Sequence, residues 1–377
     1  MNKKLMFVVN VDWFFMSHRL PIALEATRQG YEVHIATGIT NQQEAMEEHG
    51  LIVHPVSIDR SSANVVGAFK TLVQLLSIFR EVKPDLVHLV TIKPVLLGGV
   101  AARLAGIHGV VAAVSGLGYV FLDRGWVSRV RRRLVGLLYR LALGHGNLKV
   151  IFQNPDDRDV LMRLAALPTN KVEMIRGSGV DLNEFCYKPM PEGAPVVLMA
   201  GGLLADKGIR EFVGAAYLLR GQYQSVRFCV VGTPDPANPS SVSEAELAKW
   251  EGDGAIERWG YRADMANVLS AAHIVVLPSY REGVPKVLLE AAAVGRPTVT
   301  TDVPGCRDAI LANETGLLVP ARDTQALALA IEKLLKEPKL CVEMGLAGRT
   351  LAEQEFDVVQ VVAKHMQIYR TISSGHI

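Results

Sequence analysis

The chain of 377 residues has few cysteines, few aromatic residues and almost no net charge. Its four cysteines show no C-x-x-C spacing, which argues against a zinc site or a disulfide scaffold and is typical of reduced thiols in a cytoplasmic protein. A formal net charge of +2 argues against a nucleic-acid partner. Polar residues interrupt every long apolar run, so no transmembrane helix is expected. The first run, Leu5–Val11, fits a β-strand better than a signal peptide.

What the chain does have is a regular alternation of strand-like and helix-like segments. At 377 residues, with 49% hydrophobic and 21% charged residues, it is long enough for two globular domains. The strands expected in the first half are Leu5–Val11, Glu32–Thr37, Val53–Pro55, Leu86–Leu89, Val110–Val114 and Val150–Gln153. Helical stretches between them predict an α/β fold with doubly wound parallel sheets, in which ligands bind at the carboxyl ends of the strands.

One stretch in the second half predicts an anion site. An apolar strand, His273–Leu277, is followed by a polar turn and by Pro285, which suits the first position of a helix. The helix is expected to cover Lys286–Val294, because Gly295 comes directly after it. Free N–H groups and the helix dipole at such a start attract negative charge.

Two carboxylates flank this predicted anion site. Glu282 lies in the turn and Glu290 inside the helix, about 7.5 Å beyond Pro285 at the usual helical rise. A diphosphate between them would place one carboxylate near each end of a sugar nucleotide, and carboxylates accept hydrogen bonds from sugar hydroxyls. Alternatively, Glu282 is a surface loop residue and Glu290 a solvated helix residue.

The segment Glu282–Glu290 resembles the E-x7-E motif of retaining GT-B glycosyltransferases of family four. The resemblance implies two Rossmann-like domains facing a cleft, with Glu282 on the donor sugar and Glu290 on the ribose. The residues that would hold the donor diphosphate between them are Gly283, Val284, Pro285, Val287 and Leu288.

Residues 201–208, GGLLADKG, resemble the family's G-R-L-x-x-x-K-G phosphate clamp. Lys207 matches the lysine of the clamp, which implies that it neutralises the diphosphate. Gly202 stands where the family usually has arginine, so one charge-assisted contact of about 1.5–3 kcal/mol is missing there. Arg281 or Arg19 could compensate. Further along, residues 259–265, which include Arg262, resemble the segment that reads the base, and the family position favours uracil.

In the first half, the loops after the strands carry the candidate residues. Residues 12–21 predict an aromatic-rich loop, in which Arg19 could hold a phosphate and the aromatic rings either stack on a sugar or pack beneath the loop. Ser115 follows a strand where family members often have a histidine. We keep Ser115 as a candidate catalytic residue, although serine removes one obvious general base.

Residues 126–142 predict an amphipathic, arginine-rich helix. Its functional interpretation is an interfacial helix on anionic lipid, and the alternative is a packed helix with a solvated basic face. The sequence Asp157-Arg158-Asp159 spells D-x-D, a metal signature of the other glycosyltransferase fold. Because Asn154 and Pro155 predict a helix start there, we interpret these acids as first-turn residues and expect no metal.

The resemblance extends over nearly the whole chain. It implies an N-terminal acceptor domain of residues 1–183 with a returning helix in 356–377, and a C-terminal donor domain of residues 184–355. The expected function is transfer of a hexose or N-acetylhexosamine from a UDP-sugar to a polyprenyl-diphosphate-linked saccharide in O-antigen or capsule synthesis. The enzyme would need no cofactor and would act at the inner face of the bacterial cytoplasmic membrane. The alternatives are a UDP-sugar 2-epimerase and an inactive donor-binding partner subunit.

Overall fold

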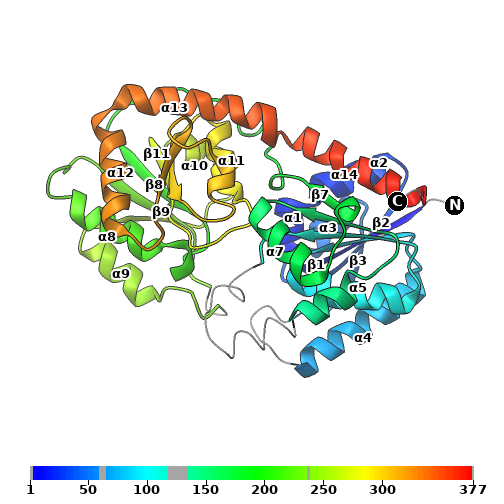
Figure 1. Cartoon of the computed structure of the whole chain (residues 1–377). Helices are drawn as coiled ribbons and strands as arrows, with labels where there is room; N and C mark the ends of the chain where they lie inside the picture. The colour runs from blue at the N-terminus through cyan, green and yellow to red at the C-terminus, as the bar shows by residue number, and fades with distance from the viewer. Residues whose placement is uncertain (1–2, 59–64, 118–134, 236–237, 376–377) are drawn as a thin grey trace. The chain divides into compact units, whose positions relative to one another are not determined.

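The computed structural model describes residues 3–58, 65–117, 135–235 and 238–375 (Figure 1). It divides into two compact units, unit 1 with residues Met1–Ser178 and Val359–Ile377, and unit 2 with residues Gly179–Val358. The sequence placed these divisions a few residues away, after residue 183 and before residue 356. Each unit contains one parallel sheet, which confirms the predicted α/β class with two Rossmann-like domains.

The sheet of unit 1 has the strand order β3-β2-β1-β4-β5-β6-β7. Its strands are β1 (Lys4–Val11), β2 (Glu32–Gly38), β3 (Ile52–Pro55), β4 (Leu86–Val90), β5 (Gly109–Val114), β6 (Leu148–Phe152) and β7 (Val172–Met174). The helices given for this unit are α1 (Asp12–His18), α2 (Leu20–Arg28), α3 (Gln43–Glu48), α4 (Val65–Val82), α5 (Ile92–Ala105), α7 (Pro155–Ala165), η2 (Thr169–Lys171) and α14 (Val358–Ser373). The strand order reverses between β1 and β4, where open sheets of this kind bind ligands.

The sheet of unit 2 has the order β10-β9-β8-β11-β12-β13. Its strands are β8 (Val196–Ala200), β9 (Arg227–Val231), β10 (Glu257–Gly260), β11 (Ile274–Leu277), β12 (Thr298–Thr301) and β13 (Gly316–Val319). Its helices are η3 (Ala205–Lys207), α8 (Ile209–Leu219), α9 (Glu244–Gly252), α10 (Met265–Ser270), α11 (Lys286–Ala293), η4 (Arg307–Ala309), α12 (Thr324–Lys336), α13 (Pro338–Leu351) and η5 (Ala352–Phe356).

Both faces of each sheet are covered, which explains why the strands are apolar without alternation. In β1, Met6 and Val8 belong to one hydrophobic cluster of unit 1, whereas Phe7 and Val9 belong to the other. Successive strand residues point to opposite faces, so the two clusters lie on the two sides of the sheet. No described helix combines the length and the hydropathy needed to cross a bilayer.

The structure corrects the segment after β1. Residues 12–18 form helix α1 rather than the aromatic-rich loop expected from the sequence. The carboxylate of Asp12 is buried and accepts hydrogen bonds from the N–H of Trp13 at 2.8 Å and of Thr40 at 2.6 Å. Phe15 packs edge-on against Phe7 in the core, with ring centroids 5.7 Å apart, whereas Trp13 is 44% exposed. Strand β7 has only three residues, too few for a recognisable pattern.

At the carboxyl edge of the unit 2 sheet, Gly208 allows two loops to approach closely. Its φ of +77° lies in the left-handed region, and a Cβ built on it would lie 2.2 Å from the carbonyl oxygen of Pro278. Gly208 separates η3 from α8, and Pro278 directly follows β11. Only glycine fits there, so this contact sets how the turn after β8 lies against the loop after β11.

We expect Gly208→Ala to lower the free energy of unfolding of unit 2 by about 2–3 kcal/mol, because the methyl group would add strain and overlap the Pro278 carbonyl. The matched control is Gly221→Ala, where a Cβ meets no atom within 4 Å and φ is not left-handed. That control should stay within about 0.5 kcal/mol of the parent. Urea unfolding followed by circular dichroism measures both, and equal midpoints for the two variants would contradict the assigned role of Gly208.

Candidate functional site

The turn after β8 places a lysine beside a carboxylate. The Lys207 ammonium forms an ion pair with Oε1 of Glu282, and their side chains are 29% and 11% exposed. The hydroxyl of Ser279, which is fully buried, donates to the same oxygen at 2.7 Å. Burial opposes the charge on Lys207, yet the Glu282 carboxylate raises the pKa of this ammonium above its ordinary value. Two residues predicted as catalytic, Lys207 and Glu282, are therefore in direct contact.

The loop that carries Glu282 is fixed by its backbone. The Glu282 N–H donates to the Pro304 carbonyl at 3.1 Å, and the Thr301 hydroxyl donates to the Ser279 carbonyl. Gly305 has a φ of +84°, and a Cβ there would lie 2.1 Å from the Gly283 carbonyl oxygen. The loops after β11 and β12 are therefore in close contact, and this contact holds the backbone of Glu282.

Helix α11 starts at Lys286, as predicted, and ends at Ala293, one residue earlier than predicted. Pro285 is its N-cap rather than its first residue, and the helix has no side-chain cap. The N–H of Leu288 donates to the Pro285 carbonyl at 3.1 Å. This N–H is therefore not free, although the sequence analysis expected Leu288 to help hold the diphosphate. Within the described residues, the N–H groups of Lys286 and Val287 have no such backbone partner. The side chains of Leu288 and Val284 are buried in the core. At these two positions only backbone groups are therefore available to a ligand.

Glu290 lies inside α11 and is only 6% exposed. Its carboxylate pairs with the ammonium of Lys286 at 3.1 Å, one helical turn away. Burial raises the pKa of Glu290, and the Lys286 charge only partly opposes this effect. The alternative that Glu290 is a solvated helix residue is therefore wrong, because the carboxylate is held in a mostly apolar environment.

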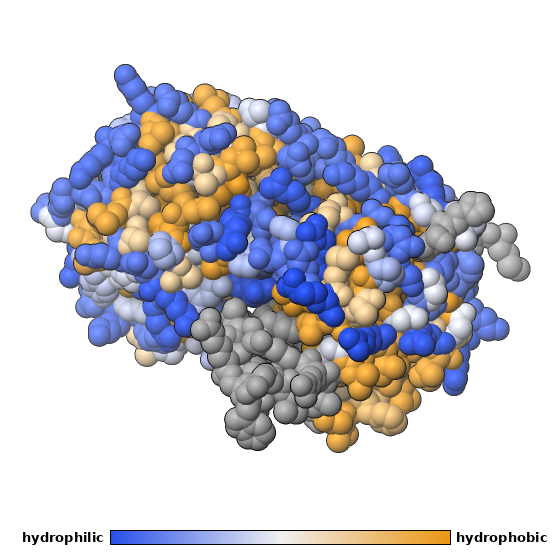
Figure 2. Space-filling model, viewed as in Figure 1, coloured by the Kyte–Doolittle hydropathy of each residue, from blue (hydrophilic) through white to orange (hydrophobic). Residues whose placement is uncertain are grey.

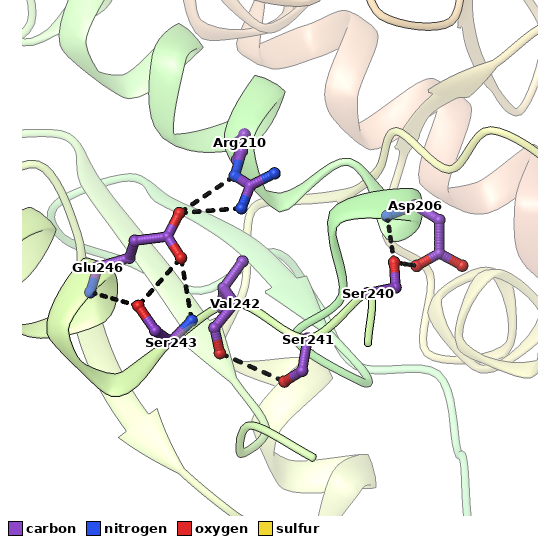
Figure 3. A network of polar contacts seen from close by, with 7 residues as sticks. All are labelled: Asp206, Arg210, Ser240, Ser241, Val242, Ser243 and Glu246. Carbon is purple, nitrogen blue, oxygen red and sulfur yellow. Dashed lines mark hydrogen bonds and ion pairs between the residues drawn. The ribbon is translucent and has the colours of Figure 1, made fainter. Parts of the chain in front are cut away.

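A polar network ties the Lys207 turn to the loop after β9 (Figure 3). Leu204 forms an antiparallel bridge with Ser241, and the Ala205 N–H donates to the Ser240 carbonyl at 2.7 Å. The Ser240 hydroxyl donates to Asp206 at 2.5 Å. Residues 233–241 are rich in proline and serine, a composition that by itself predicts an irregular loop. Its second half is instead paired with the turn that carries Lys207.

This network continues along the chain into α9. Ser243 is the N-cap of α9 and exchanges hydrogen bonds with Glu246 in a capping box. Glu246 also accepts from Arg210 in α8 at 3.0 Å (Figure 3). On the other side of the turn, the Tyr280 N–H donates to the Asp206 carbonyl at 2.9 Å. The Lys207 turn is thus held by the loops after both β9 and β11.

Two further residues of unit 2 that were predicted to contact the donor, Gly202 and Arg262, lie outside the Lys207–Glu282 pair. Gly202 is exposed, and a Cβ built on it would lie 3.5 Å from Leu204, so a larger side chain fits there. Arg262 follows β10 and pairs with Asp264 at 2.7 Å. Arg262 and Trp259 line a hollow of about 300 Å³. This hollow lies next to the segment that the sequence predicted to read the base.

In unit 1, Arg19 is buried, with an exposed fraction of 2%. It leaves the end of α1 and donates from Nη2 to the Ser115 hydroxyl at 3.3 Å, so the structure brings these two predicted residues together. Ser115 directly follows β5 and is half-buried. His88 of β4 and Tyr369 of α14 form a buried hydrogen bond of 2.5 Å in the same unit. The sequence analysis predicted a role for neither His88 nor Tyr369. The only sign of this contact in the sequence is a histidine within an apolar strand.

The D-x-D interpretation holds as predicted. Asn154 is the N-cap of α7, its side chain accepts from the Asp157 N–H at 2.8 Å, and Pro155 is the first helical residue. In the part of the chain that the structure describes, no group of three His, Cys, Asp or Glu side chains could hold a metal ion.

Most of the predicted basic helix lies outside the described residues, and residues 135–142 are helical.

We expect Glu290→Gln to raise the free energy of unfolding at pH 7, because it removes a buried carboxylate with a raised pKa. A raised folded-state pKa means that wild-type stability falls as pH rises from the unfolded value of about 4.3 through the folded value. The gain should therefore be larger at pH 7 than at pH 4, measured by urea unfolding at both pH values. Glu332→Gln is the control of opposite sign, since Lys336 lowers the pKa of Glu332. Equal behaviour of the two variants would contradict the burial argument.

Comparisons with known proteins agree with this geometry. Residues 4–154 match the family model described as glycosyl transferase 4-like, and residues 194–337 match that of glycosyl transferases group 1. Among solved structures, the fold is similar to sucrose-phosphate synthase from Thermosynechococcus elongatus, with a TM-score of 0.80, 21% identity and coverage of 99% of this chain and 100% of the other. It is also similar to HepE from Anabaena, with a TM-score of 0.78, 17% identity and coverage of 98% and 100%.

Two curated relatives have names that specify their reactions. N,N'-diacetylbacillosaminyl-diphospho-undecaprenol alpha-1,3-N-acetylgalactosaminyltransferase of Campylobacter jejuni is 28% identical over 94% of this chain and 97% of its own length. UDP-Gal:alpha-D-GlcNAc-diphosphoundecaprenol alpha-1,3-galactosyltransferase of Escherichia coli is 25% identical over 81% and 80%. With both units matched by glycosyltransferase family models, the chain is a GT-B glycosyltransferase and belongs to the group 1 glycosyl transferase family.

Proposed function

We propose that the chain transfers a hexose or N-acetylhexosamine from a UDP-sugar to a polyprenyl-diphosphate-linked saccharide, with retention of configuration. The reaction would belong to the synthesis of a bacterial surface polysaccharide, an O-antigen or a capsule. Both relatives named above act on sugars linked to undecaprenyl diphosphate, and the name of the E. coli relative specifies UDP-galactose. Their similarity extends over both units of this chain, which supports the same classes of donor and acceptor.

The observation that carries the proposal is the contact between Lys207 and Glu282 at the carboxyl edge of the unit 2 sheet. A diphosphate bound at the start of α11 would lie near a lysine already fixed in the turn after β8. Lys207 and the N–H groups of Lys286 and Val287 would stabilise the departing diphosphate, a preorganised electrostatic role. Glu282 would orient the transferred sugar, and the buried Glu290 would accept hydrogen bonds from the ribose.

We infer a mechanism that needs neither a metal nor a protein nucleophile. The positive charge that a metal would supply at the diphosphate comes from Lys207 and the α11 helix dipole. The resemblance to retaining family members implies front-face attack, in which the leaving phosphate helps to deprotonate the acceptor hydroxyl. Ser115 accepts a hydrogen bond from the Arg19 guanidinium, so it would position a substrate group rather than act as a base.

We further propose that the enzyme works at the inner face of the cytoplasmic membrane, where a polyprenyl-linked acceptor would be located. Apolar surface lies over the region of α4 in unit 1 (Figures 1 and 2). Val65 is 80% exposed and Phe69 67%, with Lys70 exposed beside them. Residues 135–142, the described end of the predicted basic helix, expose Leu137 and Arg140. Apolar side chains mixed with cations favour an anionic lipid surface.

The test is a turnover assay of the purified chain with a panel of UDP-sugars, with and without a short polyprenyl-diphosphate-linked saccharide. We expect UDP release that depends on the acceptor, resists EDTA, and gives an α-linked product by NMR. Interconversion of UDP-sugars without acceptor would indicate the epimerase instead. Donor binding without turnover in any combination would indicate the inactive partner subunit.

We expect Gly202→Arg to tighten UDP binding about tenfold, because it restores a charge-assisted contact of roughly 1.5–3 kcal/mol at a position with room for the side chain. Calorimetric titration with UDP measures this affinity. Gly202→Gln, which adds a side chain of similar length without charge, is the matched control and should change the affinity little. Unchanged affinity in Gly202→Arg would contradict the placement of this loop beside the diphosphate.

A further inference from the structure

Unit 1 has a group of buried polar atoms without partners at the ends of its central strands. Oδ1 of Asn10, Oγ1 of Thr91 and Nε of Arg19 are buried and form no hydrogen bond. Asn10 lies at the end of β1, Thr91 directly follows β4, and Arg19 follows α1. Buried polar atoms are nearly always hydrogen-bonded in folded proteins, so a cluster of exceptions calls for a physical reason.

Sheet register brings these residues to one edge. Val8 of β1 pairs with Leu89 of β4, and Val90 of β4 pairs with Ala113 of β5. Asn10, Thr91 and Ser115 come shortly after these pairs, so all three lie at the carboxyl edge of adjacent strands. The strand order reverses between β1 and β4, so this edge is the switch point of the sheet, where ligands bind.

The charge of Arg19 is not neutralised by any group in the described part of the chain. Its Nη1 donates to the His18 carbonyl at 3.0 Å and its Nη2 to the Ser115 hydroxyl, and both acceptors are uncharged. Burial lowers the pKa of Arg19 to about 10, a value at which the guanidinium stays charged at neutral pH. The Tyr369 phenol nearby has a pKa raised well above its ordinary value by burial, so it is neutral too.

The two histidines near Arg19, His88 and His365, do not neutralise its charge either. Burial lowers the pKa of His365 to about 3 and that of His88 well below its ordinary value, and the charge of Arg19 lowers both further. Arg296 in unit 2 is another buried arginine with neutral partners and an Nε that forms no hydrogen bond, but its Nη atoms have more acceptors than those of Arg19. Its Nη atoms donate to four backbone carbonyls, those of Lys188, Pro189, Ser270 and Gly295.

The start of α5 adds positive potential at the same edge. Thr91 is the N-cap of this helix of 14 residues, and its side chain makes no capping hydrogen bond. Its φ of +74° is left-handed, which is costly for a β-branched residue and is found mostly at functional sites. The Thr91 N–H donates to the Ala113 carbonyl at 3.2 Å, so the start of α5 lies beside the end of β5, where Ser115 bonds to Arg19.

We propose that this edge of unit 1 binds a phosphate group, and that the group is the diphosphate of the lipid-linked acceptor. A tetrahedral anion accepts hydrogen bonds from Arg19, Ser115 and Thr91 together and gains from the α5 dipole. Water could satisfy the hydroxyl and amide groups, but it cannot neutralise the guanidinium. The anion site stands on the geometry alone, whereas its assignment to the acceptor rests on the function proposed above.

The first experiment is calorimetric titration of the full chain with pyrophosphate in saturating UDP, which occupies the donor site. We expect one binding event, weakened at least tenfold in Arg19→Lys and several-fold in Thr91→Val. The control is Thr71→Val, a buried threonine of α4 whose hydroxyl bonds to the carbonyls of Ser57 and Gly67. It tests whether loss of stability alone affects binding, and its affinity should match wild type. Equal affinity in wild type and both site variants would overturn the proposal, as would absence of binding in wild type.

Thermal unfolding keeps the result interpretable if a variant folds poorly. Arg19→Met removes an uncompensated charge, so its melting temperature without ligand should not fall below that of wild type. Pyrophosphate should raise the melting temperature of wild type but not of Arg19→Met. A large drop in melting temperature together with retained stabilisation by pyrophosphate would show that Arg19 is structural and would overturn the proposal.

Kinetics separate the two sources of phosphate. If the acceptor diphosphate binds here, Arg19→Lys raises KM for the lipid-linked acceptor about tenfold and leaves KM for the UDP-sugar unchanged. A rise confined to the UDP-sugar would overturn the assignment to the acceptor. Lack of turnover in wild type with every acceptor would count against the proposed function, whereas the pyrophosphate titration still decides whether the anion site exists.

Discussion

The ion pair between Lys207 and Glu282 is the contact on which the rest of the unit 2 site depends. It joins the turn after β8 to the loop after β11, two segments that are far apart in sequence. The close approach of Gly208 to Pro278 brings these segments together at the backbone level, and Ser279 fixes the carboxylate that Lys207 faces. A salt bridge that remains partly exposed to solvent stabilises a fold only modestly. Its value here is geometric, because it holds a cation in place beside a helix start.

Much of the fold and part of this site could be predicted because the signals are local. The apolar run of β11, the proline before α11 and the glycine after it lie within one short stretch, and each acts on its immediate neighbours. The order of strands and helices follows in the same way, since a parallel sheet covered on both faces requires continuous apolar strands. The resemblance to a known family also implies that Lys207 lies at the donor diphosphate and Glu282 at the donor sugar, so it placed both residues in one site without predicting that they touch.

What sequence reasoning missed depends on contacts between distant segments. Ser241 pairs with Leu204, so a loop rich in proline and serine stabilises the turn that carries Lys207. No local sequence pattern predicts this pairing. Helix α1 replaced an expected loop because Asp12 is bonded to Thr40 in the segment after β2. Arg19 lies close enough to α14, from the other end of the chain, for its charge to lower the pKa of His365 and to oppose the rise that burial causes in the pKa of Tyr369. Such features follow from topology, which spacing and composition do not encode.

The candidate sites of the two units differ in how their charged side chains are paired. In unit 2, Lys207 pairs with Glu282 and Glu290 pairs with Lys286, so both carboxylates of the predicted donor site already have a cation beside them. In unit 1, Arg19 has only neutral partners. Arg296 of unit 2 is also buried among neutral partners, but its two Nη atoms reach four carbonyls, whereas those of Arg19 reach one carbonyl and one hydroxyl. Binding sites are where natural proteins leave local rules unsatisfied, because the ligand completes the interactions that the chain omits.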